Sequence, residues 1–216
     1  MQKILIIFIA FLQFFSVFAA DDPAKKTGQN TEKWKFVGEE DGLKLYERNH
    51  EGSDIKEVKA VVTYQGTIQE AVDIMFDRLK HPQIFKYITF SDVLKKNDKC
   101  DWSYNQISVP VASNRDYYVK SCRVDNKDGS VSVTWVPFDD PKYPVTDKFV
   151  RVADNKGFYK FTQVEPDKIK VDYYIYNDPG GSLPVFVKNI AARQAVKDTL
   201  WTLHKEIMKR RAASKK

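Results

Sequence analysis

The sequence Asn-Asp-Pro-Gly-Gly-Ser-Leu-Pro at residues 177–184 separates two segments of different periodicity. Residues 168–176 alternate polar and apolar, as a strand with one buried side does, and one face carries Ile169, Val171, Tyr173 and Ile175. Residues 185–211 hold apolar residues at helical spacing with no internal Gly or Pro. We therefore expect a strand, a sharp turn and a long helix, capped by Ser182 and with Pro184 in its first turn.

The rest of the chain reads as strands around one shorter helix. Thr67 and Glu70 form a capping box that opens this helix. It is expected to end before Pro82, and its apolar side carries Ile68, Val72, Met75, Phe76 and Leu79. Strands are expected at residues 43–48, 55–64, 88–95, 102–109, 115–125, 131–137 and 157–164. This order predicts an α+β fold in which the long terminal helix buries its apolar stripe on an antiparallel sheet.

The N-terminal segment differs from the rest of the chain. Residues 1–19 combine a basic start, an apolar stretch and small residues before a cleavage point, which predicts a secretory signal peptide. An uncleaved membrane anchor is the alternative, although Ile4–Phe18 is short for a bilayer. Residues 20–33 are polar and are expected to be a flexible leader, residues 34–211 to be one domain and residues 212–216 a basic tail. We expect an exported protein, either periplasmic or secreted.

Two motifs in this domain resemble the START family, the steroidogenic acute regulatory protein-related lipid transfer domains. Residues 109–119 resemble its Pro-x-x-x-Arg-Asp-aromatic strand start, with one more residue between Pro110 and Arg115, and residues 177–184 match its Asp-Pro-Gly-Gly-Ser-Leu-Pro turn into the last helix. The resemblance runs from about Trp34 to Met208 and is strongest to stand-alone bacterial members. It implies a helix-grip fold, in which a curved antiparallel sheet wraps around the long C-terminal helix. It also implies a cavity for a lipid or sterol-like ligand between them.

The resemblance singles out Arg115. In the family the matching Arg faces the cavity and pairs with an acid on a neighbouring strand, and Asp101 and Asp172 are both candidates for that acid. Adjacent strand residues point to opposite faces, so Arg115 and Asp116 cannot both face inward. A strand start at the surface is the alternative reading.

An inward Arg115 would place a mainly apolar wall around the ligand. The candidate ligand-binding residues are Arg115, Tyr117, Val119, Tyr159, Phe161, Val171, Tyr173, Ile175, Phe186, Ile190 and Gln194. For each apolar member, ordinary core packing is the alternative.

The two cysteines are expected to form a disulfide. If the strands around Cys100 and Cys122 form a hairpin that turns at residues 110–113, these residues lie opposite each other or one residue out of step. An oxidising compartment favours the bond, which would stabilise the fold by about 3 kcal/mol. Two buried thiols or a shifted register is the alternative.

The composition of the terminal helix suggests a second kind of partner. From Lys188 onward the chain has nine Lys or Arg residues against Asp198 and Glu206. This surplus indicates either a solvated helix face or attraction to an anionic membrane surface.

Signals for catalysis, metal binding and nucleic-acid binding are lacking. The sequence has no His-Glu-x-x-His, Gly-x-Ser-x-Gly, Gly-rich phosphate loop or Cys-x-x-Cys, and its three histidines have no metal-ligand spacing. We expect a monomeric, non-catalytic carrier of a hydrophobic molecule that uses no cofactor or metal and binds no nucleic acid. The alternatives are an enzyme like the cyclases and hydrolases of the wider superfamily, and an interaction module with a filled core.

Overall fold

Ten strands form one sheet in the computed structural model, which describes residues 32–108 and 112–214. The strand order is β1-β2-β3-β10-β9-β7-β6-β5-β4, with antiparallel neighbours throughout, while β8 pairs in parallel with β6. The strands are β1 (Lys35–Glu40), β2 (Leu43–His50), β3 (Ser53–Gln65), β4 (Ile88–Lys96), β5 (Cys100–Ile107), β6 (Arg115–Asp125), β7 (Val131–Pro137), β8 (Val150–Arg151), β9 (Asp154–Glu165) and β10 (Lys168–Asp178).

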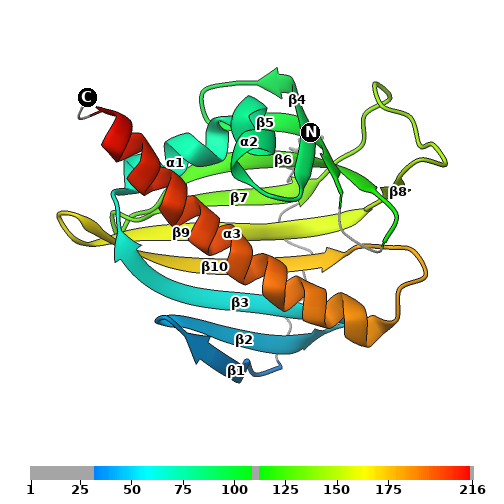
Figure 1. Ribbon diagram of the computed structural model, residues 1–216, viewed down its shortest axis with the longest axis horizontal. Helices are drawn as coiled ribbons and strands as arrows, with labels where there is room; N and C mark the ends of the chain where they lie inside the picture. Colours follow the sequence, from blue (N-terminus) through cyan, green and yellow to red (C-terminus); the bar gives the residue numbers. More distant parts are fainter. Residues whose placement is uncertain (1–31, 109–111, 215–216) are drawn as a thin grey trace, which may run out of the picture. The chain divides into compact units, whose positions relative to one another are not determined.

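The helices pack on one face of this sheet (Figure 1). They are α1 (Ile68–Phe76), the short 3₁₀ segment η2 (Arg78–Lys80), α2 (His81–Ile84) and α3 (Val185–Ser214). The capping box at the start of α1 is confirmed, because Thr67 accepts a hydrogen bond from the backbone of Glu70 and the Glu70 carboxylate accepts one from the backbone of Thr67. The predicted α+β helix-grip fold is confirmed.

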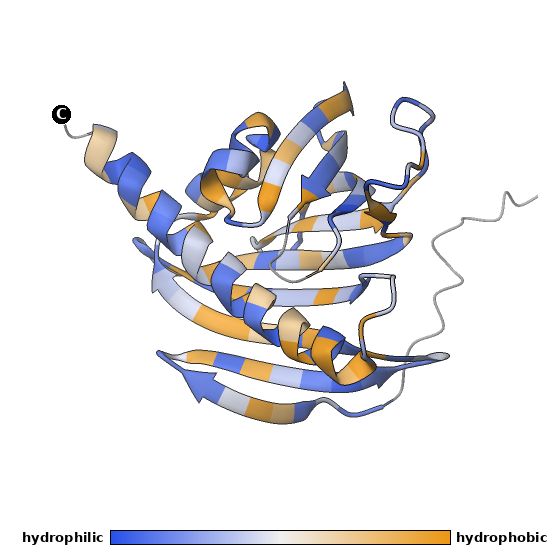
Figure 2. Ribbon diagram, turned by 45° about the vertical axis from the view of Figure 1, so that its right-hand side comes forward, coloured by the Kyte–Doolittle hydropathy of each residue, from blue (hydrophilic) through white to orange (hydrophobic). Residues whose placement is uncertain are grey.

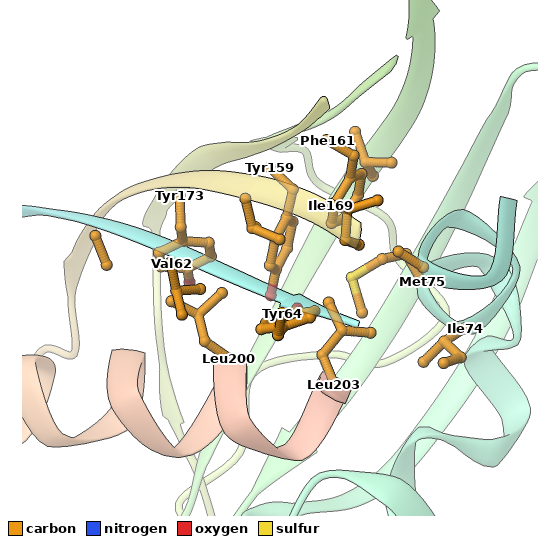
Figure 3. Close-up of a cluster of buried hydrophobic side chains, with 14 of the residues drawn as sticks. Val62, Tyr64, Ile74, Met75, Tyr159, Phe161, Ile169, Tyr173, Leu200 and Leu203 are labelled. Carbon is orange, nitrogen blue, oxygen red and sulfur yellow. The ribbon is translucent and has the colours of Figure 1, made fainter. Parts of the chain in front are cut away.

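The C-terminal half of α3 supplies the apolar contact between helix and sheet. The buried residues of the helix are Val196, near its middle, and Leu200, Leu203 and Ile207 in this half, spaced so that they fall on one helix face. In Figure 3, Leu200 and Leu203 lie below side chains that descend from the sheet, among them Val62 and Tyr173. Burying each such side chain stabilises the fold by about 1.5–3 kcal/mol.

Ion pairs fix the last turns of α3. The Arg211 guanidinium donates to both carboxylate oxygens of Glu70 on α1, at 2.6 and 2.7 Å, and lies 2.6 Å from Asp167 in the β9–β10 turn. Arg210 donates to Asp77 at 2.8 Å. Ion pairs therefore hold this end of the helix against the α1 region and the β9–β10 turn.

Two local expectations were wrong, and an edge strand was missed. The first helix ends at Phe76, where Asp77 leaves the helical conformation, so that Leu79 is 65% exposed instead of buried. At the start of α3 the Pro184 carbonyl accepts from the backbone of Val187 and Lys188, so Pro184 and not Ser182 occupies the capping position. Strand β1 was not expected, because it lies at the sheet edge with nearly every residue exposed and so has no alternating pattern.

The predicted disulfide is confirmed. Cys100 and Cys122 lie directly opposite each other in the β5–β6 pairing and are bonded. The expected signal peptide, residues 1–19, and most of the expected leader lie outside the described residues, and the division into segments stays a prediction. At the other end α3 continues to Ser214, so residues 212–214 of the expected tail are helical.

His81 makes the stability of the fold depend on pH. It is 3% exposed, its Nε2 lies 3.0 Å from the Ile74 carbonyl oxygen, and burial lowers its pKa to about 3. The unfolded chain binds this proton near pH 6.5, so the stabilisation is present above that pH and is lost as the pH falls toward 3.

We therefore expect His81 alone to reduce the free energy of unfolding by about 2 kcal/mol between pH 7.5 and pH 5. Urea unfolding at several pH values measures this, and His81→Gln should remove that part of the slope. An unchanged slope in the variant would contradict the assignment.

Candidate functional site

The inner face of β9 and β10 carries five of the predicted ligand-binding residues. Phe161 pairs with Val171 and Tyr159 pairs with Tyr173 across the two strands, and all four are buried in the apolar core with Ile175 packed against it. The rings of Tyr159 and Tyr173 lie 4.6 Å apart between centroids. Near the C-terminal half of α3 these side chains therefore pack together, as Figure 3 shows for Tyr159, Phe161 and Tyr173.

Strand β6 places Tyr117 on the same inner side. The two neighbours of Tyr117, Asp116 and Tyr118, face the other way: Asp116 binds Arg151 and Tyr118 bonds to the backbone of Tyr143. Burial raises the pKa of Tyr117 to about 12, yet its side chain keeps partly accessible surface, whereas Val119 is fully buried. Tyr117 is therefore less tightly enclosed than Val119 on the same strand face.

A buried ion pair lies close to Tyr117. Arg78 from η2 donates to Asp101 on β5 at 2.9 Å, and the two side chains are 11% and 1% exposed. The second carboxylate oxygen of Asp101 has no hydrogen-bond partner among the described residues. Burial raises the pKa of Asp101, while the nearby Arg78 guanidinium opposes this effect. Asp101 thus presents one free acceptor atom in the interior.

Small polar residues extend this polar region along β4 and β5. The Ser91 hydroxyl donates to the Asn105 side-chain oxygen at 2.6 Å, and the Asn105 amide donates to Ser103 at 3.3 Å. All three are buried, as is Ser121 opposite Asp101. The interior is therefore polar along β4–β6 and apolar along β3, β9 and β10.

Trp135 joins these two regions. Its ring centroid lies 5.5 Å from that of Tyr159 and 5.8 Å from that of Tyr173, and its indole N–H donates to Asn155 at 2.9 Å. Gly157 is opposite Trp135 in the β7–β9 pairing. A Cβ at Gly157 would come within 2.5 Å of the indole and 2.2 Å of the Tyr174 carbonyl oxygen, so only glycine leaves room for the ring.

Neither of the two acids expected beside Arg115, Asp101 and Asp172, pairs with it. Asp101 pairs with Arg78, and Asp172 lies 3.1 Å from Lys170. Arg115 is buried, but its guanidinium donates to the backbone carbonyls of Ser113 and Pro179. The sequence did not indicate Arg78 as the partner of Asp101, because the apolar spacing through Leu79 placed Arg78 on a continuation of the first helix.

The helix residues expected in the wall also lie elsewhere. Phe186 is 66% and Ile190 53% exposed, and Gln194 is exposed too. Gln194 is two positions from the buried Val196, a rotation of about 200° around the helix. Ile190 and Gln194 instead line a surface hollow of about 430 Å³ between α3 and β1–β2. Figure 2 shows hydrophobic residues at the start of α3, where Val185, Phe186 and Ile190 are exposed.

Acids neutralise most of the basic charge on α3. Arg193 pairs with Glu47 and Lys197 with Glu40, both on the first two strands. Lys188, Lys209, Arg210 and Arg211 also lie within ion-pair distance of acids. The charge surplus of the helix sequence is therefore largely balanced within the described residues.

Residues 32–108 and 112–214 contain neither a metal-binding cluster nor a membrane-spanning helix. No group of three or more His, Cys, Asp or Glu side chains is placed to hold a metal ion. No helix in this part of the chain combines the length and apolar character needed to cross a membrane.

The fit between Trp135 and Gly157 leads to a prediction. We expect Gly157→Ala to lower the free energy of unfolding by about 1–3 kcal/mol, because the added methyl group meets both backbone and indole. Urea unfolding measures this loss. Gly38→Ala is the control, since a Cβ there meets nothing within 4 Å. Equal stability of the two variants would show that the indole does not occupy this position.

Comparisons with known proteins agree on one family. The START domain model matches residues 17–215. A STAR-related lipid transfer protein from Xanthomonas axonopodis superposes with a TM-score of 0.75 and 26% identity, covering 82% of this chain and 99% of that one. An uncharacterized protein, PA1579, from Pseudomonas aeruginosa is 24% identical over 83% of this chain and 89% of its own length.

A more distant likeness concerns the fold alone. The Zhui aromatase/cyclase from Streptomyces sp. R1128 superposes with a TM-score of 0.52 at 11% identity, covering 71% of this chain and 94% of that one. An enzyme can thus be built on a related arrangement of sheet and helix.

Proposed function

Because the chain belongs to the START domain family, we propose that it binds one hydrophobic ligand, a lipid or sterol-like molecule, between its sheet and α3. The START fold generally binds hydrophobic ligands. The observation that carries the proposal for this chain is the free buried acceptor of Asp101, on the inner side of the sheet that also carries the partly accessible Tyr117.

The polar region determines which kind of polar group the buried end of the ligand can carry. The free Asp101 oxygen accepts a hydrogen bond, and the charge of this carboxylate is already balanced by Arg78. A hydroxyl or amide would donate to Asp101 without adding charge, whereas a carboxylate or phosphate would meet a negative group at close range. We therefore propose that an uncharged polar group of the ligand lies at Asp101 and that its hydrocarbon lies along the aromatic side chains.

Hydrocarbon burial is large enough to hold such a ligand. Removing about 300 Å² of apolar ligand surface from water gives about 7 kcal/mol before the costs of association are subtracted. Transfer between membranes would in addition require the ligand to leave, so moderate net affinity suits a carrier.

An enzyme acting in the same space is the alternative, supported by the fold likeness to an aromatase/cyclase. The buried tyrosines and Asp101 favour ligand binding over catalysis. Burial raises the pKa values of Tyr117, Tyr159 and Tyr173, so these phenols keep their protons and act as hydrogen-bond donors. Asp101 is held by Arg78, and among the described residues it makes no hydrogen bond to the hydroxyl of Ser121 opposite it, as a base that activates a nucleophile would.

We further propose that the protein acts after export. The signal-like pattern of residues 1–19 and the Cys100–Cys122 disulfide, which suits an oxidising compartment, support this. Mass spectrometry of the mature N-terminus tests it, and retention of residues 1–19 would contradict it.

The binding proposal is tested with two matched variants. Asp101→Asn removes the interior charge, while Asp172→Asn makes the same chemical change on the opposite side of the sheet, in a pair with Lys170. Wild-type protein purified from cells is expected to carry a co-purifying lipid in native mass spectrometry. Asp101→Asn should lower the lipid-bound fraction by at least about tenfold, since a hydrogen bond to a charged group is lost, and Asp172→Asn should leave it unchanged.

Organic extraction then identifies the lipid and separates the alternatives. Recovery of an unaltered lipid that rebinds to the stripped protein supports a carrier. Conversion of that lipid during incubation would support the enzyme. Equal loss in both Asp variants, or a protein that takes up no lipid, would contradict the interior site.

A further inference from the structure

Arg115 is a buried cation with no acid beside it. It exposes 5% of its surface, and no carboxylate lies within ion-pair distance of its guanidinium among the described residues. Its hydrogen bonds go to two backbone carbonyls: Nη1 donates to Ser113, and Nε donates to Pro179 at 3.5 Å. Carbonyl dipoles satisfy N–H groups but do not cancel a charge, so the positive charge stays uncompensated.

The acids next to Arg115 are already engaged. The Asp116 carboxylate accepts two hydrogen bonds from Arg151, at 2.7 and 2.8 Å, and a third from the Tyr104 hydroxyl. Asp178 lies 3.4 Å from Lys188 and accepts from the backbone of Gly180 at 3.0 Å. Neither acid is available to move onto Arg115 without leaving another cation unpaired.

Among the described residues, the third nitrogen of the guanidinium has no acceptor. Nη2 donates no hydrogen bond within the described part of the chain, and Gly181 is the neighbour on that side. Gly181 has a φ of +67°, and a Cβ there would approach Nη2 to 3.7 Å, so glycine at this position leaves Nη2 without a side chain from residue 181 against it. Burial also lowers the pKa of Arg115, which agrees with a guanidinium that lacks a counter-charge.

From this arrangement we infer that Arg115 forms an anion-binding site, between Ser113 and residues 179–181, that takes a phosphate group. A planar guanidinium binds phosphate oxygens through two parallel hydrogen bonds, which compensates its charge as carbonyls cannot. The phosphate can belong to a lipid headgroup or be free in solution. This site differs from the interior one at Asp101, which suits an uncharged group.

Occupation of this site would loosen the start of α3. The Pro179 carbonyl belongs to the turn before the helix, and a phosphate on Arg115 competes with that carbonyl for the same donor. The first turns of α3 have little apolar anchoring, since Val185, Phe186 and Ile190 are 40%, 66% and 53% exposed. The site would thus couple contact with a phosphate-bearing surface to opening of the interior. This coupling rests on the proposed function, whereas anion binding itself does not.

The test follows the Arg115 side chain directly. The Nε–H signal of Arg115 is recorded by ¹H–¹⁵N NMR in the mature wild-type protein at constant ionic strength. The probes are inorganic phosphate and vesicles of phosphatidylcholine with phosphatidylglycerol. Arg115→Gln, Arg115→Lys and the control Arg123→Gln, on the same strand but paired with Asp125 at the surface, are titrated in parallel by calorimetry.

We expect a saturable shift of the Arg115 signal and, in Arg115→Gln, affinity at least about tenfold weaker. Arg123→Gln should bind as the wild type does, and Arg115→Lys should keep part of the affinity. A response to both probes assigns the site to phosphate in general, and a response to vesicles alone assigns it to a lipid headgroup. An Arg115 signal that neither probe moves, or an Arg115→Gln variant that binds like the wild type, overturns the inference. Lipid bound in the interior should co-purify with Arg115→Gln, so failure here is distinguishable from failure of the proposed function.

Discussion

The packing of the C-terminal half of α3 on the inner face of the sheet fixes one end of the helix, and the access of a ligand to the interior depends on the other end. Leu200, Leu203 and Ile207 are fully buried against the central strands, and Arg210 and Arg211 fix the end of the helix by ion pairs. The first turns lack such anchors: Val185, Phe186 and Ile190 are exposed, and the Asn189 side chain makes a polar contact with the backbone of Lys56. One end of the helix is therefore fixed, and the other can move at a lower cost in free energy.

The interior beneath the helix has two chemically different sides. Aromatic and aliphatic residues of β3, β9 and β10 form one, and Ser91, Asn105 and the Arg78–Asp101 pair form the other. Trp135 lies between them over Gly157. Such a surface matches a molecule that is mostly hydrocarbon with one uncharged polar group, which is the physical reason to propose a lipid or sterol-like ligand. The charge of Arg115 serves a separate purpose, since it lies beside the turn that precedes α3.

Local patterns in the sequence predicted the helices and strands. They failed to predict the position of a side chain where this position depends on contacts between distant segments. Alternation predicted β10, the absence of Gly and Pro predicted α3, and hairpin spacing predicted the Cys100–Cys122 bond. Residues on central strands, such as Tyr173, were placed correctly on the inner face, because the apolar residues of an alternating strand share its buried side. Phe186, Ile190 and Gln194 were misplaced because an apolar residue on a helix does not reveal which side meets the sheet. Arg78 and Trp135 were missed because only the register of distant segments brings them to Asp101 and Gly157.

Fluorescence quenching by a brominated ligand tests the central claim, hydrocarbon bound between sheet and helix, most directly. Two single-tryptophan proteins are compared, one keeping Trp135 on the inner side and one keeping Trp102, which lies on the outer side between Lys95 and Lys120. A fatty alcohol brominated in mid-chain quenches only the indoles that it touches. The account predicts saturable quenching of Trp135 and none of Trp102. Equal quenching of both, or of neither, would contradict it.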